Sequence, residues 1–326
     1  MDLVNHLNDR LLFAVPKKGR LNQQCLDLLH GSDIQFHRHS RLDIALCLNL
    51  PIALVFLPAA DIPTFVGEGR VDLGITGRDQ VAEAQSDVEE LLDLQFGRCK
   101  LQIQVPENGE YDDPKQLIGK QICTSFIGLA GEYFANLERE AGKEKEAGKD
   151  QADLLDVEVK GGARSGSTMG RLATKIKYVG GSVEAACALG VADGIVDLVE
   201  SGETMKAAGL KPIATILETT AILIKSKHPS NPELINTIES RIRGVITAKK
   251  YILCTYNVPR NLITEATIIT PGKRAPSVTT LDEEGWVAVS AMVEKKNIAT
   301  VMDKLEALGA TDILVMPISN SRTTRD

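Results

Sequence analysis

The chain has 326 residues, of which 43% are hydrophobic and 25% are charged, and its formal net charge is −7. This length exceeds one ordinary domain, so we expect two or three domains. The negative charge and an aromatic content of only 4% argue against a nucleic-acid partner. No apolar run reaches the roughly 20 residues that a membrane span requires, so we expect no membrane partner.

The six cysteines and five histidines show no spacing typical of a metal site. The cysteines form no C-x-x-C pair, and we interpret them as reduced, buried thiols. His37 and His39 alternate on a predicted strand, and we do not favour a metal site there. The first ten residues lack the apolar stretch of a secretory signal, so we expect a cytoplasmic protein.

Predicted strands and helices alternate along the first 140 residues. They lie at 11–15 (strand), 21–29 (helix), 52–57 (strand), 61–67 (helix), 71–76 (strand), 79–84 (helix), 101–105 (strand), 121–124 (strand) and 130–140 (helix). Such alternation predicts a mostly parallel sheet that binds ligands at the carboxyl ends of its strands.

Residues 139–170 interrupt this pattern, because they are rich in Gly, Lys, Glu and Ser. With few apolar residues, they predict a flexible surface insertion, although their basic residues could also touch a phosphate. Elements resume with a strand at 176–179, a helix at 183–189 and a strand at 194–199. We expect residues 213–225 to return to the first sheet.

The last hundred residues form a separate predicted unit. A helix presents Leu234, Ile238, Ile242 and Val245 on one face, and the order βαββαβ follows. That order is typical of a ferredoxin-like domain. We therefore divide the chain into a first lobe (1–103 and 206–228), a second lobe (104–205) and a C-terminal domain (229–326).

The strongest candidate for a binding site is the segment 180–204. Carboxylates at Asp193, Asp197 and Glu200 precede the loop S-G-x-T at 201–204. Small residues before a helix let backbone N–H groups approach an anion, and carboxylates suit the hydroxyls of a sugar. The segment could thus hold a ribose 5′-phosphate, but an ordinary strand, turn and helix with Ser201 as N-cap fits the spacing equally well.

Three weaker candidates lie elsewhere. The cations of Lys17-Lys18-Gly19-Arg20 follow the first strand, where α/β folds bind ligands. The segment 72–79 contains Gly74 and Gly77, whose small size lets the backbone approach a ligand. Thr124 and Ser125 offer hydroxyl donors at the end of another strand.

Taken together, the strings at 67–77, 181–210 and 270–289 closely resemble ATP phosphoribosyltransferases, most nearly the long form found in fungi. The resemblance covers essentially the whole chain, although the insertion at 139–170 departs from the compact family pattern. It implies two catalytic lobes like those of periplasmic binding proteins, with the active site in their cleft, and a C-terminal regulatory ferredoxin-like domain.

The resemblance also implies an activity. The 5-phosphoribosyl group of phosphoribosyl pyrophosphate would pass to N1 of ATP, releasing pyrophosphate, in the first step of histidine biosynthesis. Mg²⁺ would be bound mainly through the substrate phosphates, and histidine would inhibit the enzyme. Relatives form hexamers built from dimers, so we expect a homo-oligomer of this kind.

By the same resemblance, Asp193 and Asp197 would hold the ribose hydroxyls and the loop 200–204 the 5′-phosphate, while basic residues would meet the other phosphates. The expected catalytic and substrate-binding residues are Lys17, Lys18, Arg20, Arg41, Asp72, Gly74, Gly77, Thr124, Ser125, Glu184, Asp193, Asp197, Glu200, Ser201, Gly202, Glu203 and Thr204. The expected histidine-binding residues are Asn257, Lys273, Ser277 and Asp312.

Three other functions fit parts of the sequence. A solute-binding protein would share the two-lobed fold, but the absence of a signal and the extra βαββαβ domain disfavour it. A phosphoribosyltransferase of the orotate or purine-salvage kind usually carries two adjacent acids after an apolar run, which the chain lacks here. A catalytically inactive regulatory subunit would be expected to lack either the basic loop or the loop 200–204, and both are present.

Overall fold

We describe the chain from a computed structural model, which covers residues 7, 9–38, 42–142 and 172–322. Arg41, His39 and most of the predicted insertion therefore lie outside the described residues. The chain divides into two compact units. The first comprises residues 1–25, 38–46 and 51–230, and the second comprises residues 26–37, 47–50 and 231–326.

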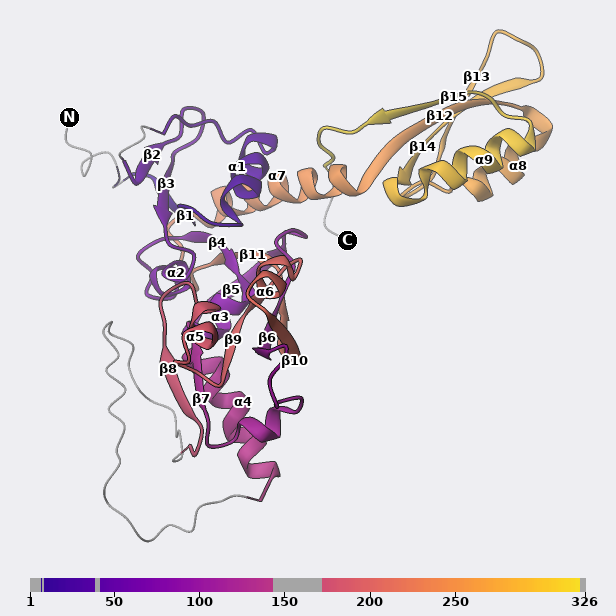
Figure 1. Cartoon of the computed structure of the whole chain (residues 1–326). Helices are drawn as coiled ribbons and strands as arrows, with labels where there is room; N and C mark the ends of the chain where they lie inside the picture. Colours follow the sequence, from indigo (N-terminus) through magenta and orange to yellow (C-terminus); the bar gives the residue numbers. More distant parts are fainter. Residues whose placement is uncertain (1–6, 8, 39–41, 143–171, 323–326) are drawn as a thin grey trace, which may run out of the picture. The chain divides into compact units, whose positions relative to one another are not determined.

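The first unit begins with a six-stranded sheet of order β2-β3-β1-β4-β11-β5 (Figure 1). Its strands are β1 (Leu11–Pro16), β2 (Ile44–Leu46), β3 (Ile52–Leu57), β4 (Leu73–Gly77), β5 (Glu89–Asp93) and β11 (Ala221–Lys225), with helices α2 (Ile62–Gly67) and α3 (Arg78–Ala84). Helix α1 (Asn22–Gly31) follows β1 and belongs to the second unit from residue 26 onward. The central strand β1 runs parallel to β3 and β4. Apolar side chains such as Phe13, Leu54 and Ile75 are fully buried in this sheet, as their uninterrupted apolar runs predict.

A five-stranded sheet of order β10-β6-β9-β7-β8 forms the rest of the first unit. Its strands are β6 (Cys99–Pro106), β7 (Gln121–Thr124), β8 (Lys175–Tyr178), β9 (Gly194–Val199) and β10 (Leu210–Thr219), with helices η2 (Pro114–Leu117), α4 (Ile127–Glu140), α5 (Ala185–Ala188) and α6 (Glu203–Ala207). Strand β9 runs parallel to β7 and antiparallel to β6. The two sheets confirm the expected two-lobed α/β core. The expectation of a mostly parallel sheet is wrong, because β2, β5, β10 and β11 pair antiparallel with their neighbours, as β6 does with β9.

The chain passes between the two sheets twice, after β5 and after β10. We expected residues 213–225 to return to the first sheet, and this expectation is wrong for β10, because it pairs antiparallel with β6 along its length. Only β11 returns. The crossings therefore lie at 94–98 and at residue 220, whereas the predicted lobe boundaries were at 103 and 206.

Helix α4 begins three residues earlier than predicted, and its first turn is capped from another element. The Glu83 carboxylate on α3 accepts hydrogen bonds from the backbone N–H groups of Gly128 and Leu129, at 2.8 and 2.9 Å. A helix start leaves such N–H groups without partners inside the helix. The capping residue Glu83 thus lies 45 residues before Gly128 in the sequence, so the local sequence does not predict where this helix begins.

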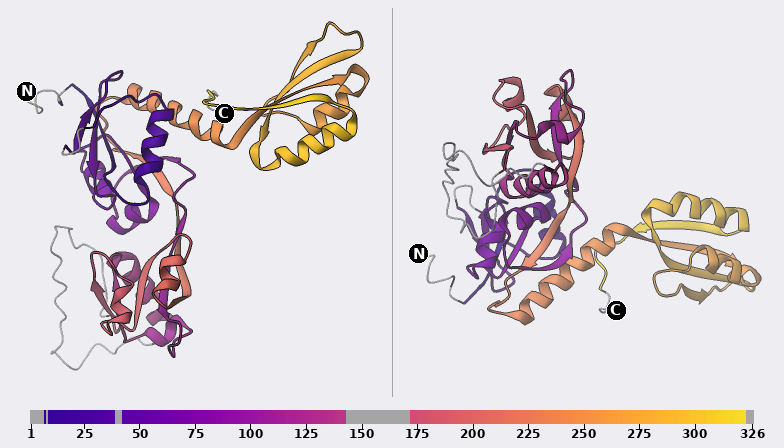
Figure 2. Two further views of the ribbon diagram at one scale, coloured as in Figure 1. Left: turned by 45° about the horizontal axis from the view of Figure 1, so that its top comes forward. Right: turned by 90° about the horizontal axis from the view of Figure 1, so that it is seen from below.

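The second unit contains the long helix α7 (Pro232–Lys250) and a four-stranded antiparallel sheet of order β13-β14-β12-β15 (Figure 2). The sheet elements are β12 (Tyr251–Pro259), η3 (Arg260–Leu262), α8 (Ile263–Ile269), β13 (Ser277–Thr280), β14 (Trp286–Glu294), η4 (Lys295–Asn297), α9 (Ile298–Leu308) and β15 (Thr311–Pro317). The expected ferredoxin-like βαββαβ order is confirmed. Along β14 every second residue is buried, so one face of this strand packs on the core.

A short N-terminal segment belongs to this second unit, which the sequence did not predict. Of the predicted helix face, Ile238, Ile242 and Val245 are buried on α7. Gly31 lies so close to α7 that a Cβ there would be 3.2 Å from Val245. Arg241 Nη1 donates to the Asp33 carbonyl at 2.9 Å, which fixes the end of α1 against α7.

Candidate active site

A pocket of about 260 Å³ lies at the carboxyl end of β9. Its walls come from the loop after β1, from strand β6, from β9 and from the loop that enters α6. The lining residues are Arg20, Cys99, Gln104, Glu184, Asp197, Leu198, Val199, Glu200, Ser201, Gly202, Thr204 and Met205. The fold therefore brings one member of the predicted basic loop together with six of the eight site residues predicted in the segment 180–204, namely Glu184, Asp197, Glu200, Ser201, Gly202 and Thr204.

The loop from Glu200 to Thr204 turns sharply on a glycine. Gly202 has φ +80° and is the N-cap of α6. This left-handed conformation is easy for glycine and strained for other residues. The Ser201 hydroxyl accepts a hydrogen bond from the Glu203 N–H at 3.4 Å. Glu203 itself is exposed and does not line the pocket.

Three carboxylates line the pocket, those of Glu184, Asp197 and Glu200. Burial raises the pKa of Asp197, the Leu198 N–H bond at 2.8 Å lowers it, and the charge of Glu184 raises it further. A carboxylate in this state gains from a partner that carries positive charge or donates hydrogen bonds. The pocket thus offers acceptor oxygens to hydroxyl groups or to a cation.

Arg20 supplies positive charge on the other side of the pocket. Its Nη1 donates to the Gly97 carbonyl at 2.5 Å, and its Nη2 lies 3.9 Å from Asp79 Oδ1. The two lysines of the same predicted loop do not line the pocket. Lys17 forms an ion pair with Asp43 at 2.8 Å, and Lys18 is exposed.

Strand β6 contributes two lining residues that the sequence analysis missed. Gln104 is only 2% exposed, and its Nε2 donates to the Asp197 carbonyl at 3.4 Å. Burial raises the pKa of the Cys99 thiol to about 11, although the neighbouring Arg20 lowers it. The signal available was that Gln102 and Gln104 alternate with the apolar residues of 101–105, and the sequence does not tell which of the two glutamines is buried.

Several predicted site residues lie elsewhere and have structural partners. The Asp193 carboxylate accepts the Gln121 N–H at 2.9 Å, at the opposite end of β9. Asp72 accepts the N–H groups of Leu12 and Ser230, at 2.9 and 2.6 Å. The structure does not bring either aspartate to the pocket.

The remaining predicted residues of the core also lie outside the pocket. Thr124 is fully buried, and its hydroxyl donates to the Val196 carbonyl at 2.7 Å, while Ser125 beside it is half-buried. Gly74 allows α2 to pack closely, because a Cβ there would lie 2.6 Å from Ile62. A Cβ at Gly77 would collide with the Asp79 carboxylate.

In the C-terminal domain, two of the four predicted histidine-binding residues meet. Asn257 Nδ2 donates to Asp312 Oδ2 at 2.9 Å. Asp312 adopts φ +50°, a conformation that Asp tolerates better than most residues. Ser277 lies on β13, the edge strand opposite to β15, and Lys273 is exposed in the segment before β13.

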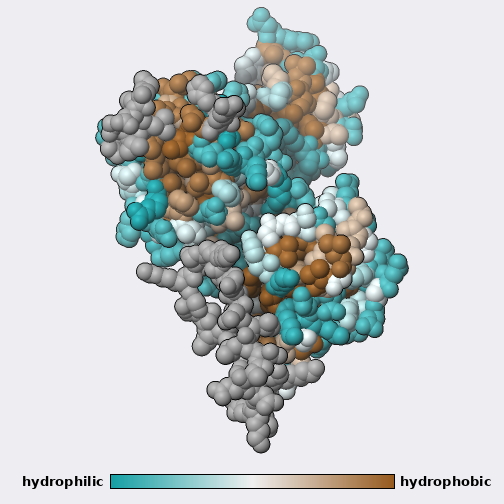
Figure 3. Space-filling model, turned by 60° about the vertical axis from the view of Figure 1, so that its left-hand side comes forward, coloured by the Kyte–Doolittle hydropathy of each residue, from teal (hydrophilic) through white to brown (hydrophobic). Residues whose placement is uncertain are grey.

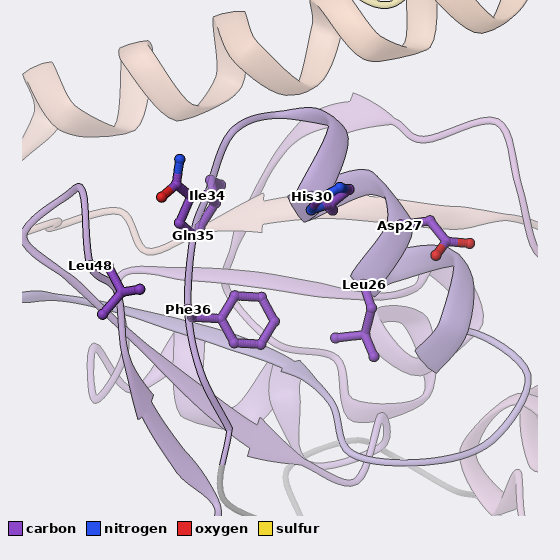
Figure 4. Close-up of a pocket in the computed structure, with 7 residues that line it drawn as sticks. All are labelled: Leu26, Asp27, His30, Ile34, Gln35, Phe36 and Leu48. Atoms are coloured by element: carbon purple, nitrogen blue, oxygen red, sulfur yellow. The ribbon is translucent and has the colours of Figure 1, made fainter.

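A second hollow, of about 450 Å³, lies in the second unit. Figure 4 shows its lining: Leu26, Asp27 and His30 from α1, then Ile34, Gln35 and Phe36, and Leu48. Leu48 is 74% exposed, so this hollow presents apolar surface to the outside. None of the predicted site residues lines it.

Within the described ranges, no three His, Cys, Asp or Glu side chains are grouped so that they could hold a metal ion. None of the described helices combines the length and the apolar character that crossing a membrane requires.

Comparisons with known proteins agree with the sequence resemblance. The family model described as ATP phosphoribosyltransferase matches residues 58–244, and that described as HisG, C-terminal domain, matches residues 248–320. The ATP phosphoribosyltransferases of Yarrowia lipolytica and Saccharomyces cerevisiae are 64% and 57% identical over 99% of this chain and 100% of their own length. Among solved structures, the ATP phosphoribosyl transferase (HisG:HisZ) complex from Thermotoga maritima covers 72% of this chain and 96% of its own, with 20% identity and a TM-score of 0.54, which supports the fold. The chain belongs to the ATP phosphoribosyltransferase family.

Proposed function

We propose that this chain is the transferase that joins phosphoribosyl pyrophosphate to N1 of ATP, giving N1-(5-phosphoribosyl)-ATP and pyrophosphate. The observation that carries this proposal is the pocket at the end of β9. It combines three carboxylates, a glycine turn and one arginine. These are the groups that a sugar bearing phosphates at both ends needs. The reaction is the first step of histidine biosynthesis.

Each part of phosphoribosyl pyrophosphate has a counterpart in the pocket. Asp197 and Glu184 accept hydrogen bonds from the ribose hydroxyls. The turn at Gly202, with the hydroxyls of Ser201 and Thr204, receives the 5′-phosphate. Arg20 meets the diphosphate, since a guanidinium pairs well with phosphate oxygens.

The chemistry requires positioning rather than a strong base. N1 of adenine has a free lone pair, so it can form the bond to C1 of the ribose without first losing a proton. The bond from C1 to the diphosphate oxygen breaks, and negative charge grows on the leaving group. Arg20 stabilises that charge, and the walls of the pocket hold C1 against N1.

The pocket also suits Mg²⁺ bound with the substrate phosphates. Mg²⁺ prefers carboxylate, phosphate and water oxygens. Glu184, Asp197 and Glu200 all line the pocket, but the described acidic side chains do not form a group of three that could hold the ion alone, so it would be bound mainly through the substrate phosphates. Asp197 would gain from a cation nearby, because burial destabilises its charged form and raises its pKa. When bound, the ion neutralises phosphate charge on the substrates and the leaving group.

Histidine would inhibit the enzyme through the C-terminal domain. The Asn257–Asp312 pair offers an amide and a carboxylate at 2.9 Å from each other, which suits the ammonium and carboxylate groups of an amino acid. Lys273 and Ser277 complete the expected set. Inhibition requires that histidine bind the inactive arrangement more tightly than the active one.

We further propose a homohexamer built from dimers, located in the cytoplasm. On the face drawn in Figure 3, hydrophobic residues form separate patches divided by hydrophilic ones. Leu48 at the second hollow and Leu314 on β15 are 74% and 58% exposed. Exposed apolar groups of this size favour contacts between subunits. None of the six cysteines, all of which the structure describes, forms a disulfide, which suits a reducing compartment.

The test is a spectrophotometric assay with ATP, phosphoribosyl pyrophosphate and Mg²⁺, run with and without histidine. Product that histidine suppresses supports the activity and its regulation. Product without suppression keeps the activity and removes the histidine site. A folded protein that makes no product contradicts the proposed function.

A further inference from the structure

Asp79 is a fully buried carboxylate beside the pocket, and the proposed reaction does not use it directly. It lies in the first turn of α3 with no exposed surface. The Thr219 hydroxyl donates to its Oδ1 at 2.8 Å, and Gln80 Nε2 donates to its Oδ2 at 2.7 Å. The Asp79 backbone N–H in turn donates to the Thr219 hydroxyl at 3.0 Å.

These contacts explain how the carboxylate is held, but they do not require its charge. A neutral oxygen would also accept the Thr219 hydroxyl, whereas burying an ionised group is unfavourable unless an opposite charge is near. The opposite charge is Arg20, whose Nη2 lies 3.9 Å from Asp79 Oδ1. The charge of Asp79 therefore acts on Arg20.

Arg20 is fixed from two directions and faces the pocket. The Gly97 carbonyl accepts a hydrogen bond from Arg20 Nη1 at 2.5 Å, and the Asp79 carboxylate attracts Nη2. Arg20 also lowers the pKa of Cys99, so its charge lies beside a lining residue of the pocket. A long side chain held at two points loses little further freedom when an anion binds to it.

Gly97, which binds Arg20, and Thr219, which binds Asp79, both lie next to or within the segments that connect the two sheets. Gly97 belongs to the crossing from β5 to β6, and Thr219 ends β10 just before the crossing to β11. The Thr220 hydroxyl donates to the Phe96 carbonyl at 2.9 Å and joins the two crossings directly. The position of Arg20 is thus set by the same segments that connect the lobes.

We propose that Asp79 is a positioning residue, which holds the Arg20 guanidinium in the orientation that receives the diphosphate of phosphoribosyl pyrophosphate. This inference rests on the proposed function. Thr219 supports it by fixing the Asp79 carboxylate. Asp79 does not touch the substrate, so its whole effect on binding passes through Arg20.

A double-mutant cycle tests this dependence. Binding of phosphoribosyl pyrophosphate with Mg²⁺ is measured by calorimetry for the wild type, Asp79→Asn, Arg20→Gln and the double variant. We expect Asp79→Asn to weaken binding about tenfold in the wild type, as for loss of one charge-assisted contact, and not at all beside Arg20→Gln. An equal loss in both backgrounds would mean that Asp79 acts independently of Arg20 and would overturn the inference.

Two further variants separate positioning from stability. Glu138→Gln is the matched control, because Glu138 is another buried carboxylate, which accepts the Ala173 and Thr174 N–H groups away from the pocket. It should lower the melting temperature and leave binding unchanged. If Asp79→Asn does not fold, Thr219→Val replaces it in the cycle, with an expected loss of about threefold. A wild type that binds no phosphoribosyl pyrophosphate would refute the proposed function and this inference together, whereas an additive cycle refutes this inference alone.

Discussion

The two ends of strands β4 and β9 use aspartate in different ways. Before each strand, an aspartate accepts backbone N–H groups: Asp72 those of Leu12 and Ser230, and Asp193 that of Gln121. At or after the other end, Asp79 and Asp197 are buried or half-buried near Arg20 and the pocket. The aspartates at the amino ends of these strands thus stabilise the fold, and those at the carboxyl ends lie in or beside the active site.

This difference has a topological cause. Parallel strands open toward loops at their carboxyl ends, so ligand groups gather there. Asp193 directly precedes β9 and Asp197 lies within it, four residues later, which separates them by about 13 Å along an extended chain. One pocket of this size therefore cannot use both carboxylates in the same way. We therefore expect Asp→Ala to lower activity at Asp197 and to lower stability at Asp193.

The largest expected effect is that of Asp197→Ala. It removes the carboxylate that accepts the ribose hydroxyls and attracts Mg²⁺, so kcat/KM should fall by about a hundredfold or more. Stability at pH 7 should not fall, because an unfavourably buried charge disappears. Steady-state kinetics and thermal melting check both parts. If Asp197→Ala retained its activity, Asp197 would not belong to the active site.

Gly202→Val should produce the next largest effect. A β-branched residue at φ +80° is strained by about 1–2 kcal/mol, so the turn opens and phosphoribosyl pyrophosphate binds about tenfold more weakly. Gly119→Val is the matched control, since Gly119 has φ +81° and open space around it outside the pocket. Gly119→Val should lower the free energy of unfolding through the same strain, and it should leave the affinity for phosphoribosyl pyrophosphate unchanged. Equal affinity in both variants would remove the turn from the site.

Asp193→Ala should lower the free energy of unfolding by about 1–2 kcal/mol, because the Gln121 N–H loses its acceptor. Its kcat and KM should stay within about twofold of the wild type, as for a change remote from the pocket. Urea denaturation and steady-state kinetics measure the two quantities. A loss of activity without a loss of stability would place this aspartate in the site after all.

The smallest expected effect concerns pH. The pKa of Asp197 is raised in the folded protein, mainly by burial, so the folded state keeps this proton at pH values where the unfolded state has lost it. The free energy of unfolding must therefore fall as pH rises from the ordinary Asp range through the raised pKa. Asp197→Asn should lack this component, so its stability relative to the wild type should increase with pH. Urea denaturation at several pH values tests the sign, and a difference that shrinks with rising pH would contradict it.

Local patterns predicted most of the elements, because their apolar periodicity is strong. The βαββαβ order was readable, and so was the buried face of α7. Strand β5 was missed, since its sequence Glu89–Asp93 carries three acids and no apolar run. The membership of β10 in the second sheet was also missed, because pairing with β6 is decided by tertiary contacts rather than by its own residues.

The site was only partly predictable for the same reason. Segment 184–204 is continuous in sequence, so its acids and its glycine turn could be recognised together. Gln104 and Cys99 join it from β6, which lies about a hundred residues earlier and pairs with β9 only in the folded chain. Whether an aspartate faces a pocket or caps a neighbouring backbone depends on which end of a strand it occupies, and composition does not reveal this.

The most direct test of the pocket at the end of β9 is a calorimetric titration of phosphoribosyl pyrophosphate with Mg²⁺ into three proteins: the wild type, Asp197→Ala and Asp193→Ala. We expect the wild type and Asp193→Ala to bind with the same affinity and Asp197→Ala to bind at least tenfold more weakly. If Asp193→Ala loses binding while Asp197→Ala keeps it, phosphoribosyl pyrophosphate does not bind in the pocket at the end of β9.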